Sequence, residues 1–437
     1  MNSSDWYGHP RMLPLPPRET SMNGRIDMRK ITFLAVLPLL IATTAALAQS
    51  VPQSGEVDVC VYAATPSGIL AAITVQREGR SAVIVEPSRW VGGMLGAGLK
   101  PWQDCPNYAA TGGMPRALLP TLGRETKLQD SQDYGVASKI DDSERLPTTG
   151  TQNSQVYGPE AISEDFQKLL EKYGIRVIRE HRIARCEMRE ARIAAATFDL
   201  TPFDELGCPA PEPAVGDNLQ VLAKVFIDAS YEGDLMARAG VGYRVGREAE
   251  SEFDEPHAGV QPPMELTPID PFVEPGRPES GLLKWVEEDH GKPVGAADDY
   301  TQAYNYRYYT TSDPEKQFAI TPPADYDPLE FELVGRYVAH LVETTDDPER
   351  LHKRLVGIFP GWMNAGEWNY QRNSLFSMAP LGISQLYADG DHATKACVWK
   401  QHQDYLRGLH HFMSTDSRVP QSYREEVAQL GLDARFH

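Results

Sequence analysis

The chain has 437 residues, which is room for two or three domains of ordinary size. With 41% hydrophobic and 24% charged residues it can bury a sizeable core, which excludes a wholly disordered chain and a protein with many membrane spans. Its formal charge of −19 repels phosphate backbones and anionic lipid, so we expect no nucleic-acid partner, and contact with a membrane only through an uncleaved leader.

The first 48 residues are expected to lie outside the folded protein. Residues 1–27 have no apolar period and carry four prolines, which indicates disorder or a start assigned too early. Residues 28–48 contain Arg29 and Lys30, then the uncharged run Ile31–Ala48 ending in Ala-Leu-Ala, the pattern of a cleaved signal peptide. A single transmembrane anchor is the alternative, although the run is short for a membrane span. We therefore expect an exported protein, periplasmic or extracellular.

Residues Val57–Glu86 have the length and order of one strand–helix–strand unit. Val57–Tyr62 is a short apolar run, which predicts a strand buried on both faces. Ile69–Glu78 predicts a helix that Gly79 ends, and Ser81–Glu86 predicts a second buried strand. The unit indicates an α/β fold with a doubly wound, mostly parallel sheet of the Rossmann type.

Further elements follow in chain order, separated by segments without clear periodicity. The patterns predict helices at Ser163–Tyr173, Asp234–Ala239, Leu329–Val342 and Lys395–Met413. They predict strands at Ile175–Val177, Ile183–Met188, Leu219–Ala229 and Thr301–Thr310. The last of these strands alternates polar and apolar residues, so its tyrosines would share one face.

The segment Ala63–Gly68 lies at the place of the glycine-rich loop that binds dinucleotide phosphates. Ala63 and Thr65 stand where the first two glycines are usual, and Gly68 keeps the third, which lets the helix pack on the strand. If the first position needs a positive φ, a Cβ atom costs ~1–2 kcal/mol there. Glu86 ends the second strand, where an acidic side chain binds the hydroxyl groups of an adenosine ribose. A strand-end residue that caps a loop is the alternative.

Several motifs together resemble a known family of flavoproteins. They are V-Y-A-A-T-P-S-G (61–68), E-P-S-R-W-V-G-G-M (86–94), F-I-D-A-S-Y-E-G-D-L-M-A (226–237) and H-Q-D-Y-L-R-G-L (402–409). From Val57 onward the sequence resembles the secreted FAD-dependent oxidoreductases related to the flavin domain of heterodisulfide reductase. The resemblance implies FAD held by a Rossmann-like domain and hydride transfer to the flavin from a small, polar substrate, with an electron acceptor that the sequence does not identify.

The resemblance also implies site residues, position by position. The cofactor-binding set is Ala63, Ala64, Thr65, Pro66, Ser67, Gly68, Glu86, Arg89, Gly92, Gly93, Met94, Asp228 and Ala229. The substrate candidates are Tyr231, Glu232, Gln302, Tyr304 and Arg307, and no catalytic residue is assigned. Two other interpretations stay open: the tyrosines pack a core, and Glu232 belongs to the acidic start of a helix.

The resemblance divides the chain after the leader into three parts. We expect an FAD-binding Rossmann-like domain over 49–250 with an irregular insert at 95–215, an inserted α+β substrate or cap domain over 251–345, and a helical region over 346–437. The family continues with a segment that returns to the FAD domain, so the chain is expected to be truncated. Ala388–Asp391 carries a Gly-Asp before a helix but is assigned to the helical region.

The five cysteines are scattered without a C-x-x-C motif, so we expect no iron–sulfur cluster and no metal site, although a Cys186–Cys208 disulfide is an option in an exported chain. Two other functions stay in view. One is a catalytically impaired remnant that acts as a non-enzymatic binding or surface protein. The other is a nicotinamide-dependent dehydrogenase, which Gly92 and Gly93 disfavour.

Overall fold

The structure is a computed structural model that describes residues 53–97, 111–119, 122, 159–262, 269–286, 291–304, 306, 308–361, 367–368, 375–376, 380 and 382–434. All of these belong to one compact unit, Ser50–His437. The expected leader and Arg307 lie outside the described residues. None of the helices in the described part of the chain combines the length and apolar character needed to cross a membrane.

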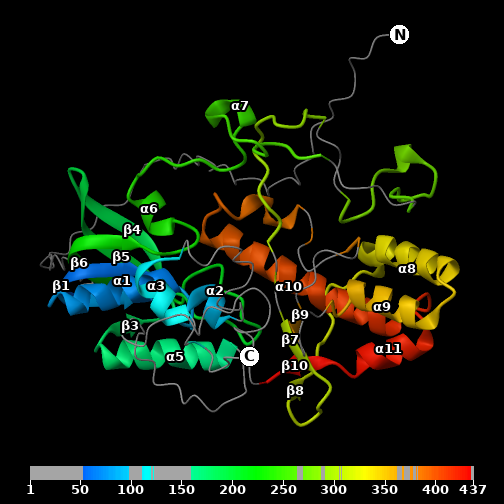
Figure 1. Ribbon diagram of the computed structural model, residues 1–437, viewed down its shortest axis with the longest axis horizontal. Coiled ribbons are helices and arrows are strands. Elements are labelled where there is room, and N and C mark those ends of the chain that lie inside the picture. The colour runs from blue at the N-terminus through cyan, green and yellow to red at the C-terminus, as the bar shows by residue number, and fades with distance from the viewer. Residues whose placement is uncertain are drawn as a thin grey trace, which may run out of the picture. The chain divides into compact units, whose positions relative to one another are not determined.

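A six-stranded mixed sheet forms one half of this unit, in the order β3-β2-β1-β6-β5-β4 (Figure 1). Its strands are β1 (Gln53–Tyr62), β2 (Ala82–Val85), β3 (Arg176–Ile178), β4 (His181–Arg189), β5 (Arg192–Leu200) and β6 (Val215–Asp228). The first four in spatial order are parallel, whereas β5 runs antiparallel to both β6 and β4. The expected α/β fold with a mostly parallel sheet is confirmed.

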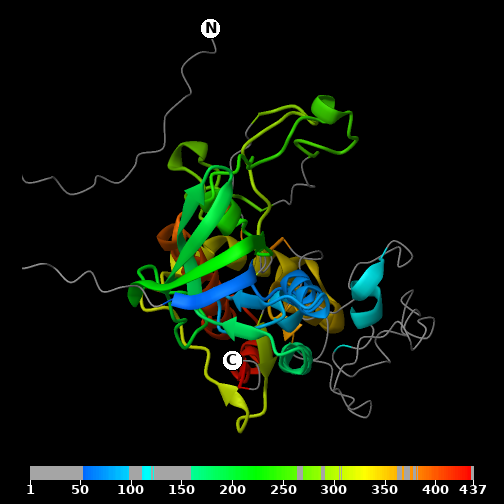
Figure 2. The same cartoon turned by 90° about the vertical axis from the view of Figure 1, so that its left-hand side faces the viewer.

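Helices α1 (Pro66–Arg77) and α5 (Pro159–Lys172) cover one face of the sheet (Figures 1 and 2). Val61 of β1 packs on that side, while its neighbours Cys60 and Tyr62 enter the cluster on the opposite face. Side chains of a strand alternate between faces, so a strand covered on both sides must be apolar throughout. The uninterrupted apolar run in the sequence follows from this burial.

The segment expected to be an irregular insert, 95–215, supplies α5 and three strands of the sheet. The strand β5 contains three consecutive alanines, Ala194–Ala196, which favour helix over strand in isolation. Pairing with both β4 and β6 overrides that local preference. The short helix α2 (Gly93–Gly96) overlaps the start of the segment, and α3 (Gly113–Leu118) falls within it.

The second half of the unit is mainly helical. It contains α8 (Glu332–Thr344), α9 (Pro348–Ile358), α10 (His392–Thr415) and α11 (Gln421–Ala428), with the short turns η5 (Pro278–Ser280), η6 (Pro328–Phe331) and η7 (Ile383–Leu386). A small antiparallel sheet joins β8 (Gln317–Phe318), β10 (Gly431–Asp433), β7 (Tyr308–Thr311) and β9 (Glu367–Trp368). Leu283 and Ile320 share one apolar core with these helices. The connection between β6 and η5 includes α6 (Asp234–Arg238) and α7 (Glu250–Phe253).

The predicted strand Thr301–Thr310 is wrong over most of its length, because β7 begins only at Tyr308. Upstream of it, backbone amides bond to side chains of η7: Thr301 to Gln385 and Tyr304 to Ser384. With its donors used in this way, the segment runs across η7 instead of pairing with a strand.

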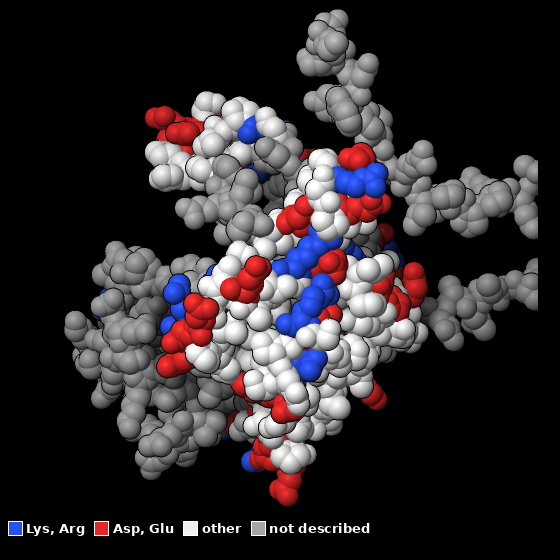
Figure 3. Space-filling view, turned by 90° about the vertical axis from the view of Figure 1, so that its right-hand side faces the viewer, with Lys and Arg blue, Asp and Glu red and all other residues white. Residues whose placement is uncertain are grey.

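Charges of both signs are present on the surface. On the face that Figure 3 shows, Lys and Arg side chains lie in a narrow run among acidic ones. The net charge of −19 therefore does not make this face uniformly negative.

Candidate functional site

The loop between β1 and α1 is a tight turn with one residue in the left-handed region. Ala63 has φ 77°, in the left-handed region where glycine is usual. Thr65 caps α1, since its hydroxyl accepts a hydrogen bond from the Gly68 amide and donates to the Ala229 carbonyl. A Cβ atom on Gly68 would lie 2.1 Å from the Ala63 carbonyl oxygen, which is well inside contact distance. Gly68 is therefore required for the close approach of helix and strand.

Ala63→Gly is expected to change the free energy of unfolding by less than about 0.5 kcal/mol. Relief of left-handed strain, about 1–2 kcal/mol, offsets both the lost burial of a methyl group, about 0.8 kcal/mol, and the freedom of glycine in the unfolded chain. The matched control is Ala72→Gly in α1, which removes an equally buried methyl group without relieving strain and should cost about 1.5–2 kcal/mol. Urea denaturation of both variants measures the difference, and equal losses would contradict the strain at Ala63.

Glu86 lies directly after β2 and is buried, with 6% of its surface exposed. One carboxylate oxygen accepts the Ala64 amide at 2.5 Å, and the other accepts the Ser88 amide at 2.7 Å and the Ser88 hydroxyl at 2.5 Å. Burial raises the pKa of Glu86, although these hydrogen bonds act to lower it. An ionised carboxylate offers about four acceptor positions, so one remains for a ligand hydroxyl group.

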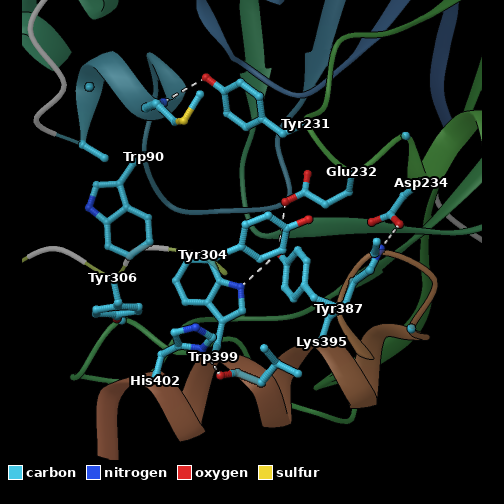
Figure 4. A pocket seen from close by; sticks show the side chains of 18 of the residues that line it. Trp90, Tyr231, Glu232, Asp234, Tyr304, Tyr306, Tyr387, Lys395, Trp399 and His402 are labelled. Carbon is cyan, nitrogen blue, oxygen red and sulfur yellow. Dashed lines mark hydrogen bonds and ion pairs between the residues drawn. The ribbon is translucent and has the colours of Figure 1, made fainter. Parts of the chain in front are cut away.

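Gly92 and Gly93 bring a third segment against the loop. The Gly92 amide donates to the Ala64 carbonyl oxygen, and both glycines have positive φ. A Cβ atom on Gly92 would lie 2.5 Å from the ring of Phe166, and one on Gly93 would lie 2.4 Å from the Tyr231 hydroxyl oxygen. That hydroxyl accepts a hydrogen bond from the Met94 amide, so Tyr231 covers the turn (Figure 4).

Asp228 stabilises the turn that follows it. Its carboxylate accepts hydrogen bonds from the Ser230 amide and hydroxyl and from the Met236 amide, which fix the entry into α6. The next residue, Ala229, accepts the Thr65 hydroxyl and so ties this turn to the loop after β1. The ends of three parallel strands, β1, β2 and β6, thus meet at one edge of the sheet, which is where ligands bind in open α/β sheets.

A cavity of 1410 Å³ opens beside these turns. Six of the predicted site residues line it: Arg89, Met94, Tyr231, Glu232, Gln302 and Tyr304. The others that the structure describes, Ala63–Gly68, Glu86, Gly92, Gly93, Asp228 and Ala229, lie in the adjoining turns and are not among its lining residues. The volume exceeds the roughly 300–1,000 Å³ of a typical small-molecule site, so a dinucleotide and a substrate can share it.

Arg89, expected to meet a phosphate, instead has partners within the protein. Its guanidinium lies 4.5 Å from the centre of the Trp90 ring and donates to the Asp204 carbonyl oxygen. Arg89 and Trp90 both line the cavity, so the cation remains at its wall.

Residues 387–391, which follow η7, and residues of α10 form the wall opposite the sheet, and the sequence patterns did not indicate this role. Tyr387 donates its hydroxyl hydrogen to Glu232 at 3.0 Å and accepts a hydrogen bond from the indole of Trp399 at 3.1 Å (Figure 4). The ring of Tyr304 meets that of Tyr387 edge to face, and Tyr306 meets Trp399 in the same manner. The one sequence feature that could have pointed to this role was the helical spacing of Lys395, Trp399 and His402 within α10.

Charged and titratable groups continue this wall. The ammonium of Lys395 contacts the Asp234 carboxylate at 2.5 Å, and His392 faces the other Asp234 oxygen at 4.0 Å. Burial lowers the pKa of His402, so its imidazole is neutral near pH 7. Its Nδ1 faces the Val398 carbonyl oxygen and therefore carries the hydrogen, which leaves Nε2 to accept from Ser384.

Segment Ala388–Asp391, assigned above to the helical region alone, also lines the cavity, and Asp391 caps α10. Cys186 and Cys208 are free thiols, and the thiol of Cys208 is directed to Gln403, so the disulfide considered above is not formed. Within the described ranges, no group of three His, Cys, Asp or Glu side chains is placed to hold a metal ion.

Comparison with known proteins identifies related sequences and structures. A model of the family described as FAD dependent oxidoreductase matches residues 58–430. A search of the curated proteins found no match.

Solved structures similar to parts of the chain include a flavin monooxygenase mutant from Stenotrophomonas maltophilia, with 16% identity, a TM-score of 0.22, and coverage of 40% of this chain and 38% of that one. L-Proline dehydrogenase from P. horikoshii has 11% identity, a TM-score of 0.26, and coverage of 44% and 58%. L-Amino acid deaminase from Proteus vulgaris has 13% identity, a TM-score of 0.27, and coverage of 44% and 51%. The chain spans less than two thirds of each of these proteins.

Proposed function

Because the chain belongs to the FAD-dependent oxidoreductase family, whose cofactor is FAD, we propose that it oxidises a small, hydroxylated substrate by hydride transfer to the flavin. The observation that carries this proposal is the 1410 Å³ cavity, which adjoins the turns after β1, β2 and β6 and has an acidic and aromatic wall. The motifs that resemble the secreted relatives of the heterodisulfide reductase flavin domain also support a flavin-dependent oxidation.

The residues at the sheet edge fit FAD. Gly68 leaves the loop amides close to the start of α1, where a helix terminus favours a diphosphate. Glu86 keeps one acceptor position for a ribose hydroxyl group. Gly92 and Gly93 let the Phe166 ring and the Tyr231 hydroxyl pack closely against the turn beside Met94. When bound, FAD supplies the two-electron redox chemistry, and the protein orients the substrate.

The cavity lining suits a carbohydrate-like or polyol substrate. The rings of Trp90, Tyr306 and Trp399 line the cavity and offer flat apolar surfaces to the carbon faces of such a molecule. Gln302 and Glu232 offer hydrogen-bonding groups for its hydroxyls. This mixture of a few polar groups on an apolar wall is typical of small-molecule sites.

A non-enzymatic binding protein is the second candidate, and two observations favour it. Ala63 is strained where the family keeps glycine, and the Glu86 carboxylate is already engaged by Ala64 and Ser88. Both features would weaken cofactor binding, the first by about five- to thirtyfold if the strain of about 1–2 kcal/mol acts on affinity alone.

The visible spectrum of the purified chain after residue 48 distinguishes the two. We expect a yellow protein that retains FAD on gel filtration and whose flavin band bleaches when sugars or polyols are added without oxygen. Dithionite bleaching is the control for a reducible flavin. A colourless protein that takes up no added FAD would support the binding protein, and an FAD-loaded protein that no hydroxylated compound bleaches would contradict the substrate class.

We further propose that the chain is exported, on the pattern of residues 28–48. Cell fractionation of the full-length chain should recover the shortened protein outside the cytoplasm. Replacing the basic pair Arg29 and Lys30 by acidic residues should retain it inside. If the unmodified chain and the acidic variant are distributed equally between the fractions, the proposal is contradicted.

A further inference from the structure

We propose that Glu232 is the catalytic base of this reaction and that Tyr387 is its positioning residue. The inference rests on the proposed function. It assigns one residue of the cavity wall to the proton of the substrate, a role that the sequence motifs leave open.

The hydrogen bonds around Glu232 have a fixed direction. The Trp399 indole can only donate, so the Tyr387 hydroxyl must accept from it and therefore gives its own hydrogen to Glu232. This order holds one carboxylate oxygen of Glu232 in place, while the second oxygen is turned away from Tyr387 (Figure 4). A carboxylate held in this way is ready to accept a proton from a ligand in the cavity.

The electrostatic surroundings increase the affinity of Glu232 for a proton, which suits a base. Burial, with the nearby Asp234 carboxylate, raises the pKa of Glu232, while the Tyr387 hydroxyl, its own backbone amide and Lys395 act to lower it. Four further titratable groups interact electrostatically with Glu232: Tyr62, Glu86, Tyr231 and Tyr304. A raised pKa makes Glu232 a stronger base than an exposed carboxylate.

Two other titratable groups of the wall, Asp234 and His402, are engaged on both sides. Asp234 faces Lys395 with one oxygen and His392 with the other. His402 uses Nδ1 on Val398 and Nε2 on Ser384. Of these three described groups, Glu232 is therefore the one with an oxygen left for a substrate.

The chemistry balances with FAD as the oxidant. The hydroxyl O–H bond of the substrate breaks and its proton goes to Glu232, while the C–H bond on the same carbon breaks and its hydrogen leaves with two electrons to the flavin. The carbon–oxygen bond becomes a carbonyl. The substrate is thereby a primary or secondary alcohol, and the proton on Glu232 returns to solvent before the next cycle.

The test uses the full FAD-loaded protein, with Glu232→Gln, Tyr387→Phe and the matched control Glu187→Gln, an exposed β4 residue bonded to Gln220. Sorbitol, glucose, inositol and glycerol are the probes, and anaerobic bleaching of the flavin is followed from acid to alkaline pH. Glu232→Gln should slow bleaching by about 10²–10⁴-fold with FAD retention unchanged. The wild-type rate should rise with pH as Glu232 ionises.

Tyr387→Phe should move the midpoint of this rise to higher pH, because the carboxylate loses a donated hydrogen bond, and should keep most of the rate at alkaline pH. Glu187→Gln should behave as the wild type. If Glu232→Gln bleaches at the wild-type rate with the same pH profile, Glu232 is not the base, although the proposed function stands. If no probe bleaches the wild type, while dithionite does, the substrate class and the base are overturned together.

Melting temperature gives a readout that is independent of turnover. A carboxyl group with a raised folded-state pKa stabilises the fold below its ordinary pKa, and this contribution is lost as pH rises through the folded-state pKa. Glu232→Gln, which cannot ionise, should therefore melt higher than the wild type at alkaline pH and equal to it in acid. The same melting difference at every pH would contradict a buried, ionising Glu232.

Discussion

Phe166→Ala is expected to lower the free energy of unfolding by about 3–5 kcal/mol, the range for a fully buried aromatic side chain. Phe166 is 0% exposed and packs α5 against α1 and β1 in the cluster that contains Val61 and Ile69. Its ring also lies against Gly92, so the cavity left by the ring would open beneath the turn that we propose to face FAD. Loss of bound FAD should accompany the loss of stability.

Urea denaturation, monitored by circular dichroism, measures this effect, with the same slope expected for both proteins. The matched control is Phe253→Ala, since Phe253 is 60% exposed on α7 and its removal should change stability by less than about 0.5 kcal/mol. Similar losses in the two variants would contradict the placement of Phe166 in the core.

Gly68→Ala should cost about 2–3 kcal/mol of stability and remove detectable FAD binding. The added methyl group would lie 2.1 Å from the Ala63 carbonyl oxygen and 3.0 Å from the Ala229 Cβ atom, so α1 must move away from the ends of β1 and β6. That movement displaces the amides at the start of α1, which we propose to bind the diphosphate of FAD.

The control for this variant is Gly242→Ala, because nothing lies within 4 Å of a Cβ atom there and its φ is not positive. It should keep both stability and the flavin spectrum. A Gly68→Ala protein that stays yellow after gel filtration would contradict the prediction.

The two buried acids of the site, Glu86 and Glu232, both have raised pKa values, mainly because of burial. Each therefore lowers stability as pH rises through its folded-state pKa, in contrast to the surface carboxylates that are paired with cations.

Local pattern was sufficient for the unit β1-α1-β2 and for most of its boundaries. A strand buried on both faces must be apolar at every position, and the helix after it ends near a glycine, here Gly79. The predicted helix start at Ile69 is three residues too late, because Thr65 caps α1 and the helix begins at Pro66. The role of Gly68 and the strain at Ala63 were also predictable, because both follow from the backbone of one turn. The family motifs lie in these same short segments.

The opposite wall of the site was not predictable in this way. Tyr387, Lys395 and Trp399 lie more than 150 residues beyond Glu232 in the sequence, and nothing in their spacing indicates that α10 faces the sheet edge. Likewise the alanines of β5 become a strand only through pairing on both sides, and the amides of Thr301 and Tyr304 bond to side chains of η7 in place of a strand. Contacts between distant segments set these features, because burial and hydrogen bonding there outweigh the weak preferences of short stretches of chain.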